Sequence, residues 1–253
     1  MSYISKEEKK IPINDPTGKW SDLTLLPEWE EQFYDVYTVR KYGKWIMLKA
    51  LKKEYADNPK YIEMLEKEFD TRYNLAHPNI VMVNDLEEVP GIGKAIITDD
   101  VYGYSLRRLI DEKRLTPRIV KRLKTQLLDA LDYIQENHIV HHPITPDSII
   151  FTEYNENLKL INVGYDQTDS LSAQDTQADI QAYGRVLAEV LDNLPESLPR
   201  LRRIANKCQD KSHPYRNVMN LQLDIERRSP MYTYLFLVLL VAIVLLLVLW
   251  LIK

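Results

Sequence analysis

The stretch His138–Phe151, HIVHHPITPDSIIF, combines a cluster of histidines with prolines and ends in an apolar run. His141 is followed five residues later by Pro146, and the apolar residues come directly after. The cluster His138, His141 and His142 raises the possibility of a metal site. Structural zinc needs four converging ligands, however, and neither a nearby cysteine nor a fourth histidine can be named. We therefore expect no metal here, and ask whether the loop performs chemistry or only shapes a fold.

Length and composition set the limits for an answer. The chain has 253 residues with 45% hydrophobic content, enough to bury one sizeable core or two lobes that share a cleft. Its 33 Lys and Arg against 37 Asp and Glu give a net charge of -4, so no basic field favours nucleic acid as a partner. The single cysteine, Cys208, excludes an internal disulfide framework and suits a reducing compartment.

The C-terminal stretch Leu235–Ile252 consists of apolar residues only. At a rise of about 1.5 Å per residue it spans roughly the hydrocarbon thickness of a bilayer, so we predict one transmembrane helix at 231–253. Arg227 and Arg228 precede the span, and only Lys253 follows it. The positive-inside tendency then predicts a single-pass anchor with residues 1–228 in the cytoplasm.

Strands dominate the first part of the chain. The stretches Lys44–Leu51, Asn79–Val89 and Gly93–Val101 are rich in apolar and β-branched residues bounded by Gly or charges, which favours strands. Between the first two, Ile62, Leu65, Phe69 and Tyr73 recur at helical spacing. Pro59 and Pro78 mark the limits of this predicted helix.

Helices dominate after Gly103. Thr116 is a predicted N-cap with Pro117 at the first helical position, and the segment 116–138 follows as an amphipathic helix. Its apolar stripe comprises Ile119, Leu123, Leu127, Leu131 and Ile134. Further helices are predicted over 178–194 and 198–210. The fold class is therefore α+β, a small β-rich lobe before a larger helical lobe. The expected boundaries are 1–22 for an N-terminal segment, 23–100 and 101–228 for the two lobes, and 231–253 for the transmembrane helix.

In its first half the chain resembles the eukaryotic-type (Hanks-type) protein kinase fold, a resemblance that runs from about Leu23 to about Ile225. Lys49, in IMLK, is similar to the lysine of the third strand, and Glu68 to its partner on the helix. Thr98 and Asp99 resemble the hinge region. The resemblance makes these four residues the candidates for binding a nucleotide.

The second half carries the same resemblance in the same order. His141–Ile150 falls on the catalytic loop H-R-D-L-x-x-x-N, and KLINVG, ending at Gly164, falls on the segment that ends in D-F-G. Asp179–Gly184, DIQAYG, resembles the D-x-W-x-x-G start of the central helix. His141, Gly164 and Asp179 are the positions expected to serve packing and turn geometry. Several such elements in order at compatible spacing indicate the fold, whereas function must be argued at the site.

The nucleotide-binding elements depart from the family pattern. The glycine-rich loop G-x-G-x-x-G-x-V aligns on WEEQFYDV, Trp29–Val36, and all three glycines are replaced. Glu30 and Glu31 put negative charge where phosphates would lie, and we interpret the stretch as a tight hairpin with a solvated acidic tip. Met47 stands where the family has the small residue above the adenine, and overpacking there typically costs about 1–3 kcal/mol. We expect this side chain to occlude the adenine space.

The catalytic positions are altered as well. The resemblance puts Pro143 at the catalytic Asp, Ser148 at the metal-binding Asn, and Asn162 at the Asp that holds magnesium. Proline cannot act as a general base, a role commonly worth about 10²–10⁴ in rate. A neutral carbonyl is a weaker magnesium ligand than a carboxylate. The segment between Asn162 and Asp179 is shorter than the family generally uses and holds no A-P-E motif, so we predict a short exposed loop there.

The sequence as a whole predicts a membrane-anchored pseudokinase, a catalytically inactive kinase-like domain that acts as a signalling scaffold or allosteric binding partner. The expected partners are the membrane, through 231–253, and a protein, with no nucleic acid. No cofactor is expected; ATP stays possible and magnesium is disfavoured. One alternative is a divergent serine/threonine kinase with weak or atypical phosphotransfer that uses Lys49, Glu68 and Asn162. A second is a nucleotide sensor that binds ATP without metal. In the pseudokinase interpretation, Lys49 and Glu68 form a structural clamp between strand and helix.

Overall fold

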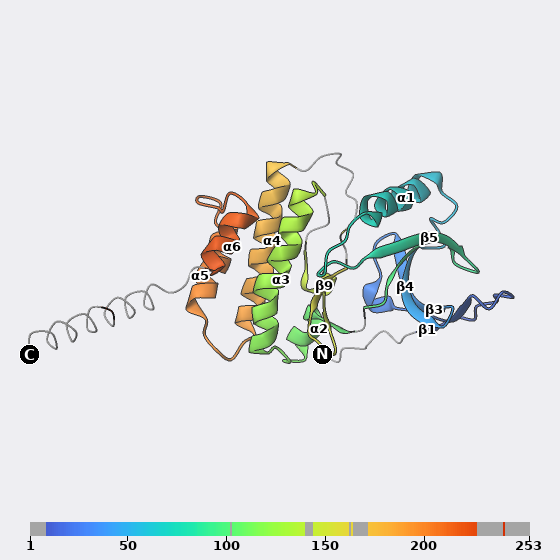
Figure 1. Ribbon diagram of the computed structural model, residues 1–253, viewed down its shortest axis with the longest axis horizontal. Coiled ribbons are helices and arrows are strands. Elements are labelled where there is room, and N and C mark those ends of the chain that lie inside the picture. The colour runs from blue at the N-terminus through green and yellow to red at the C-terminus, as the bar shows by residue number, and fades with distance from the viewer. Residues whose placement is uncertain are drawn as a thin grey trace, which may run out of the picture.

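The computed structural model describes residues 9–101, 103–139, 144–161, 163, 172–226 and 240. Two lobes follow one another along the chain, a sheet with one helix and then a helical lobe (Figure 1). This is the two-lobed α+β arrangement that the sequence predicts.

The N-lobe is built on a six-stranded antiparallel sheet. Its strands, in spatial order, are β1 (Lys9–Lys10), β2 (Trp20–Leu25), β3 (Tyr34–Lys41), β4 (Lys44–Leu51), β6 (Gly93–Asp99) and β5 (Val83–Val89). The turn between β3 and β4 is made by Tyr42 and Gly43, both at positive φ (50° and 82°), as a two-residue type I′ hairpin requires. Three boundaries differ from prediction. Strand β6 ends at Asp99 rather than Val101. The sheet starts before Leu23, and β5 starts at Val83 rather than Asn79, because Ile80 forms an isolated bridge to Leu160 of the other lobe.

Helix α1 (Pro59–Tyr73) packs on this sheet (Figure 1). It begins where the sequence predicts, because the side chain of Asn58 accepts a hydrogen bond from the backbone N–H of Lys60 and Pro59 takes the first helical position. Leu65 is fully buried, whereas Tyr73, the last residue of the predicted stripe, is 52% exposed.

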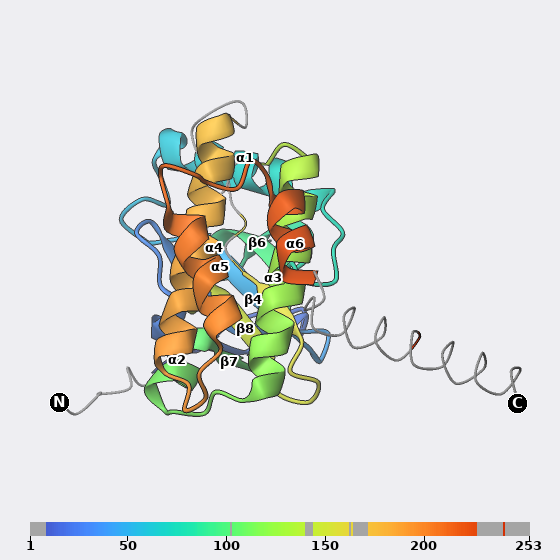
Figure 2. The same ribbon diagram turned by 90° about the vertical axis from the view of Figure 1, so that its left-hand side faces the viewer.

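The C-lobe contains the helices α2 (Leu106–Asp111), α3 (Pro117–Glu136), α4 (Ala173–Asp192), α5 (Pro199–Gln209) and α6 (Val218–Glu226). A three-stranded sheet of β7 (Gly103–Ser105), β8 (Ile149–Thr152) and β9 (Leu158–Leu160) lies on the side toward the N-lobe. The side chain of Thr116 caps α3 by accepting from Ile119 N, and the whole predicted stripe of α3 is buried. Figure 2 shows α3, α4, α5 and α6 side by side.

Helix α4 starts at Ala173, five residues earlier than predicted. The reason is a capping box, in which the side chain of Ser172 accepts from the N–H of Asp175 and the Asp175 carboxylate accepts from Ser172. Ser172 and Thr176, which the sequence places in an exposed loop, therefore belong to the cap and first turns of a helix. The loop prediction holds for neither residue.

Within the described part of the chain, no helix is both long and apolar enough to cross a membrane. The predicted span at 231–253 lies outside the described residues, apart from Leu240.

Candidate functional site

The cleft between the lobes holds a buried cluster of charges centred on Glu68. β4 points Lys49 into the cleft, and its Nζ lies 2.9 Å from Oε1 of Glu68 on α1. Arg72, one turn further along α1, contacts the same oxygen at 2.7 Å. All three side chains are buried. Sequence reasoning found the Lys49–Glu68 pair and missed Arg72, although its i, i+4 spacing from Glu68 was a usable signal.

Glu31 joins this cluster from the segment that aligns with the glycine-rich loop. Its Oε2 lies 2.8 Å from Lys49 Nζ, with only 18% of the side chain exposed. The prediction of a solvated acidic tip is therefore wrong for Glu31, because the ion pair draws its carboxylate into the cleft; Glu30 instead pairs with Lys52 at 2.6 Å. Lys49 now contacts two carboxylates, so a carboxylate stands where the lysine of this fold would meet a phosphate.

The charges of the cluster balance. Lys49 and Arg72 are cationic, while Glu31 and Glu68 are anionic. Burial by itself raises the pKa of Glu68, but the charges and hydrogen bonds of Lys49 and Arg72 outweigh burial and hold that pKa below its ordinary value. Burial, with the nearby Glu68 and Glu31 carboxylates, raises the pKa of Tyr34, whose ring lies 4.4 Å below Lys49 Nζ. Among the described residues, the cluster has no surplus positive charge to offer a polyphosphate.

The apolar part of the cleft is filled by side chains of both lobes. One continuous cluster contains Val36, Met47, Val81, Val101 and Ile150, with Leu26, Trp29 and Ile161 packed against it. Met47, predicted to occlude the adenine space, is 6% exposed and packs in the same cluster as Ile150 of the opposite lobe. Trp29 adds a second large side chain at the position of a family glycine.

The space left beside Lys49 is too small for a nucleotide. A cavity lined by Lys49, Glu31, Met47 and Trp29 measures about 40 Å³. Small-molecule sites are typically about 300–1,000 Å³. This small cavity therefore leaves no room for ATP with its magnesium beside Lys49. Among the described residues, no three His, Cys, Asp or Glu side chains cluster as metal ligands would.

A larger cavity of about 800 Å³ opens further out, between the N-lobe sheet and the β8–β9 turn. Trp29 and Met47 line this cavity as well as the small one, whereas Lys49 lines only the small one. These two side chains therefore form the wall between the outer cavity and the charge cluster. Burial raises the pKa of Asp100, which lines the outer cavity.

The remaining described candidates have structural contacts. Ser148 is buried, and its hydroxyl exchanges hydrogen bonds with the backbone of Thr145 in a capping box (2.9 and 3.1 Å). Thr98 lines the small cavity, whereas the Asp99 carboxylate accepts from Asn84 at 3.0 Å and lines neither cavity. Asp179 is buried, and its Oδ2 lies 3.4 Å from the side-chain amide of Gln135. The cleft thus brings together Lys49, Glu68 and Thr98, but not Asp99.

Four of the predicted site residues lie outside the described residues: His141, Pro143, Asn162 and Gly164.

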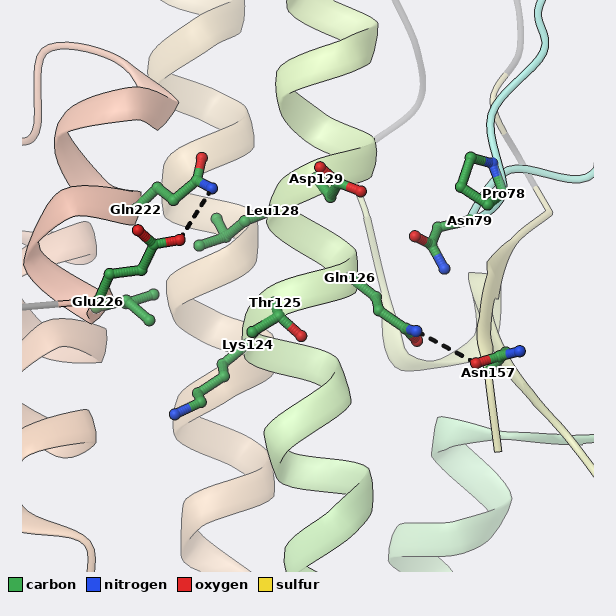
Figure 3. Close-up of a pocket in the computed structure, with 11 residues that line it drawn as sticks. Pro78, Asn79, Lys124, Thr125, Gln126, Leu128, Asp129, Asn157, Gln222 and Glu226 are labelled. Atoms are coloured by element: carbon green, nitrogen blue, oxygen red, sulfur yellow. Dashed lines mark hydrogen bonds between the residues drawn. The ribbon is translucent and has the colours of Figure 1, made fainter. Parts of the chain in front are cut away.

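Another cavity, of about 420 Å³, lies between α3, α6 and the turn before β9 (Figure 3). Its polar lining is largely engaged: Gln126 donates to Asn157 at 3.3 Å, and Gln222 donates to Glu226 at 3.2 Å. We find no grouping of acid, base and nucleophile in its lining, so the inter-lobe cleft is the better candidate site.

The order of strands, the helix packed on the sheet and the Lys49–Glu68 pair define a protein-kinase-like domain. A family model for the protein kinase domain matches residues 32–183, more than half of this chain of 253 residues. The chain therefore belongs to the protein kinase domain family.

Known kinases match part of the chain at moderate identity. The serine/threonine-protein kinase PrkC of Bacillus subtilis is 29% identical over 120 residues, 47% of this chain and 18% of the relative. PknD of Mycobacterium tuberculosis is 29% identical over 122 residues, 48% of this chain and 18% of its own. The mouse eIF-2-alpha kinase GCN2 is 30% identical over 146 residues, 56% of this chain and 8% of its own. The matches thus span less than a fifth of the length of these relatives.

Proposed function

We propose that this chain is a pseudokinase, a kinase-fold domain that performs no phosphotransfer and acts by binding a protein partner as a scaffold or allosteric subunit. The observation that carries the proposal is the occupied cleft. Glu31 neutralises Lys49 at 2.8 Å, and Trp29 and Met47 fill the apolar space above it. The replacements at Pro143, Ser148 and Asn162 support the same conclusion, since a base and metal ligands are lost together.

A divergent kinase is the second candidate, and the intact Lys49–Glu68 contact of 2.9 Å favours it. In this fold the pair positions the phosphates of a nucleotide. Here Lys49 also contacts Glu31, and Glu68 also contacts Arg72. These additional partners support a structural clamp between β4 and α1. A nucleotide sensor that binds ATP without metal is the third candidate.

A thermal-shift titration with ATP, with and without magnesium, separates the three candidates. A ligand at 100 times its Kd that binds only the folded state adds about 2.7 kcal/mol. For a domain of this size, that raises Tm by roughly 5–10 °C. We expect no shift in either condition. A shift without magnesium would establish the sensor, and a magnesium-dependent shift with phosphate transfer to a protein substrate would establish the kinase.

A variant with the cleft opened tests the physical cause. Trp29→Gly, Glu31→Gly and Met47→Ala together remove the filling side chains and free Lys49. We expect this variant to gain an ATP-dependent rise in Tm that the unaltered chain lacks. Trp45→Gly, which removes a tryptophan that lines only the outer cavity, is the matched control and should gain nothing. Equal responses of both variants would contradict occlusion by these side chains.

The catalytic positions allow a further test. Pro143→Asp, Ser148→Asn and Asn162→Asp together should not restore phosphotransfer, because Glu31, Trp29 and Met47 still fill the cleft. Clear magnesium-dependent phosphorylation by this triple variant would overturn the argument that the defect extends beyond the catalytic loop.

We further propose that 231–253 anchors the chain in a membrane with the kinase-like domain on the cytoplasmic side. The support is the uninterrupted apolar stretch and the arginine pair before it. The test is protease added to sealed, right-side-out cells, followed by detection of a tag at Met1. We expect the tag to survive until lysis. Digestion without lysis would reverse the topology.

A further inference from the structure

Helices α5 and α6 form the end of the C-lobe that faces away from the N-lobe sheet (Figures 1 and 2). α6 is the last described helix before the apolar stretch, and it ends at Glu226. Eight residues, 227–234, separate it from Leu235. An extended chain covers at most about 3.3–3.6 Å per residue, so this end of the lobe is tethered within roughly 30 Å of the start of the apolar stretch.

The charge of this end differs in sign from that of the whole chain. α5 contains basic side chains and no acidic one. Arg200, Arg203 and Lys207 recur on it at helical spacing and are exposed, as is Lys211 just beyond its end. Residues 199–226 hold six Lys and Arg against three Asp and Glu, whereas the chain as a whole is net -4. Within the described part of the chain, Arg203 and Lys211 have no acidic partner, so their charges face solvent.

Apolar side chains continue this surface on α6. Met219 and Leu223, one helical turn apart, are 61% and 60% exposed, while Val218, Leu221 and Ile225 on the opposite side of α6 are buried in the core. The two helices meet through Asp224: Lys207 Nζ lies 3.7 Å from its carboxylate, and Arg200 donates to its backbone oxygen at 2.7 Å. The helix that carries the basic stripe and the helix that carries the apolar pair therefore contact each other.

We propose that this end, the membrane-proximal face (Arg200, Arg203, Lys207, Lys211, Met219 and Leu223), docks on an anionic lipid surface. Basic side chains beside an exposed apolar pair are the chemistry that interfacial membrane binding uses. Each Lys or Arg near an anionic leaflet favours contact by roughly fivefold. The inference rests on the proposed anchor, because the net charge of -4 disfavours binding by the free domain and the tether supplies the local concentration. Docking in this way directs the inter-lobe cleft away from the bilayer.

The test uses the full chain inserted in lipid nanodiscs, either of phosphatidylcholine alone or with added phosphatidylglycerol. An environment-sensitive fluorophore is attached through Leu223→Cys. Cys208 is fully buried, so the unaltered chain serves as the labelling blank. In the anionic discs we expect a blue shift of the emission and a severalfold loss of quenching by aqueous iodide. A label at Tyr73→Cys on α1, 52% exposed in the other lobe, should show neither change.

Charge reversal identifies the cause. Arg203→Glu with Lys211→Glu should shift the ratio of docked to undocked chains by roughly 25-fold or more and restore iodide quenching at position 223. The matched control, Lys44→Glu with Lys53→Glu, changes the net charge equally at exposed positions of the N-lobe and should leave protection intact.

Three outcomes would overturn the proposal. The first is equal quenching at position 223 in the two lipid compositions. The second is protection that appears only when a disc holds two chains, which would assign the surface to a second copy. The third is removal of the chain from the discs by alkaline washing. This result would contradict the proposed anchor as well. A chain that stays inserted while its label remains exposed refutes docking alone.

Discussion

Both cations that contact Glu68 bond to the same carboxylate oxygen, Oε1 (2.9 Å from Lys49 and 2.7 Å from Arg72). At the residue scale this geometry ties strand β4 to helix α1 through buried side chains. An ion of this kind is costly to bury and is retained only while its partners remain. Glu31 is the second carboxylate that contacts Lys49. The Lys49 ammonium, which could otherwise contact a phosphate, is therefore held by ion pairs within the folded chain.

Replacing Glu68 should be strongly destabilising. Glu68→Ala leaves Lys49 and Arg72 buried with one fewer anion, and breaking a buried pair this way typically costs about 3–5 kcal/mol. The free energy of unfolding in urea measures the loss. Glu63→Ala on the same helix, where the carboxylate is 66% exposed, is the control and should change stability by less than about 0.5 kcal/mol. Similar losses for both variants would show that the cluster contributes little.

The same carboxylate predicts a dependence of stability on pH. Its pKa in the folded state is held below the ordinary value, so its contribution is present above the unfolded-state pKa of about 4.5 and is lost as pH falls through the folded-state pKa. Urea unfolding from neutral pH down to about pH 3 should show this loss. Glu68→Gln, which cannot titrate, should show a smaller acid dependence; an unchanged slope would argue against the assignment.

At the element scale, contact between α4 and α5 depends on the absence of a side chain. A Cβ built on Gly184 would lie 2.4 Å from the Cβ of Cys208 and 3.0 Å from the backbone oxygen of Ala205. Helix propensity alone favours alanine over glycine by about 1 kcal/mol, so local and tertiary preferences oppose each other here. The close approach of two helices outweighs the propensity.

Gly184→Ala should therefore destabilise the protein. Overpacking at a close helix contact costs about 1–3 kcal/mol against a gain in propensity of about 1 kcal/mol, so we expect a net loss of up to about 2 kcal/mol in chemical unfolding. Arg185→Ala, an exposed neighbour on the same turn, should change stability by no more than about 0.5 kcal/mol. An increase in stability on Gly184→Ala would show that the helices can move apart freely.

At the scale of the whole molecule, the filled cleft also joins the lobes. Met47 and Val36 of the N-lobe share one buried cluster with Ile150 of the C-lobe, so closing the cleft buries apolar surface from both sides. The core of the C-lobe ends with α6, whose Val218, Leu221 and Ile225 are among its members. Among the described residues, this core is complete before residue 227.

Truncation after Arg228 should consequently leave a soluble protein that unfolds cooperatively. Truncation after Asn217 is the contrasting variant, since it removes α6 from the core and should abolish cooperative unfolding. Circular dichroism during thermal unfolding, with size-exclusion chromatography, distinguishes the two. Aggregation of the longer fragment with exposed apolar surface would show that the apolar stretch, or a partner bound through it, completes the fold.

Local propensity and helical periodicity in the sequence determined the α+β class, the start of α1 and the cap of α3, because these signals act between near neighbours. The resemblance to the kinase family implied the two-lobed kinase-like fold and the Lys49–Glu68 pair. It also predicted that Met47 obstructs the adenine space; in the structure Met47 packs in one cluster with Ile150 of the other lobe, and the obstruction itself stays a prediction. Only the tertiary structure decided that Glu31 turns inward to Lys49, that Arg72 shares Glu68, and that Asp99 turns away toward Asn84. These outcomes depend on which strand and helix face each other across the cleft. The reason is that a buried charged side chain is stabilised by the nearest opposite charge, because the dielectric constant there is low. In the tertiary structure that opposite charge can come from a residue distant in sequence.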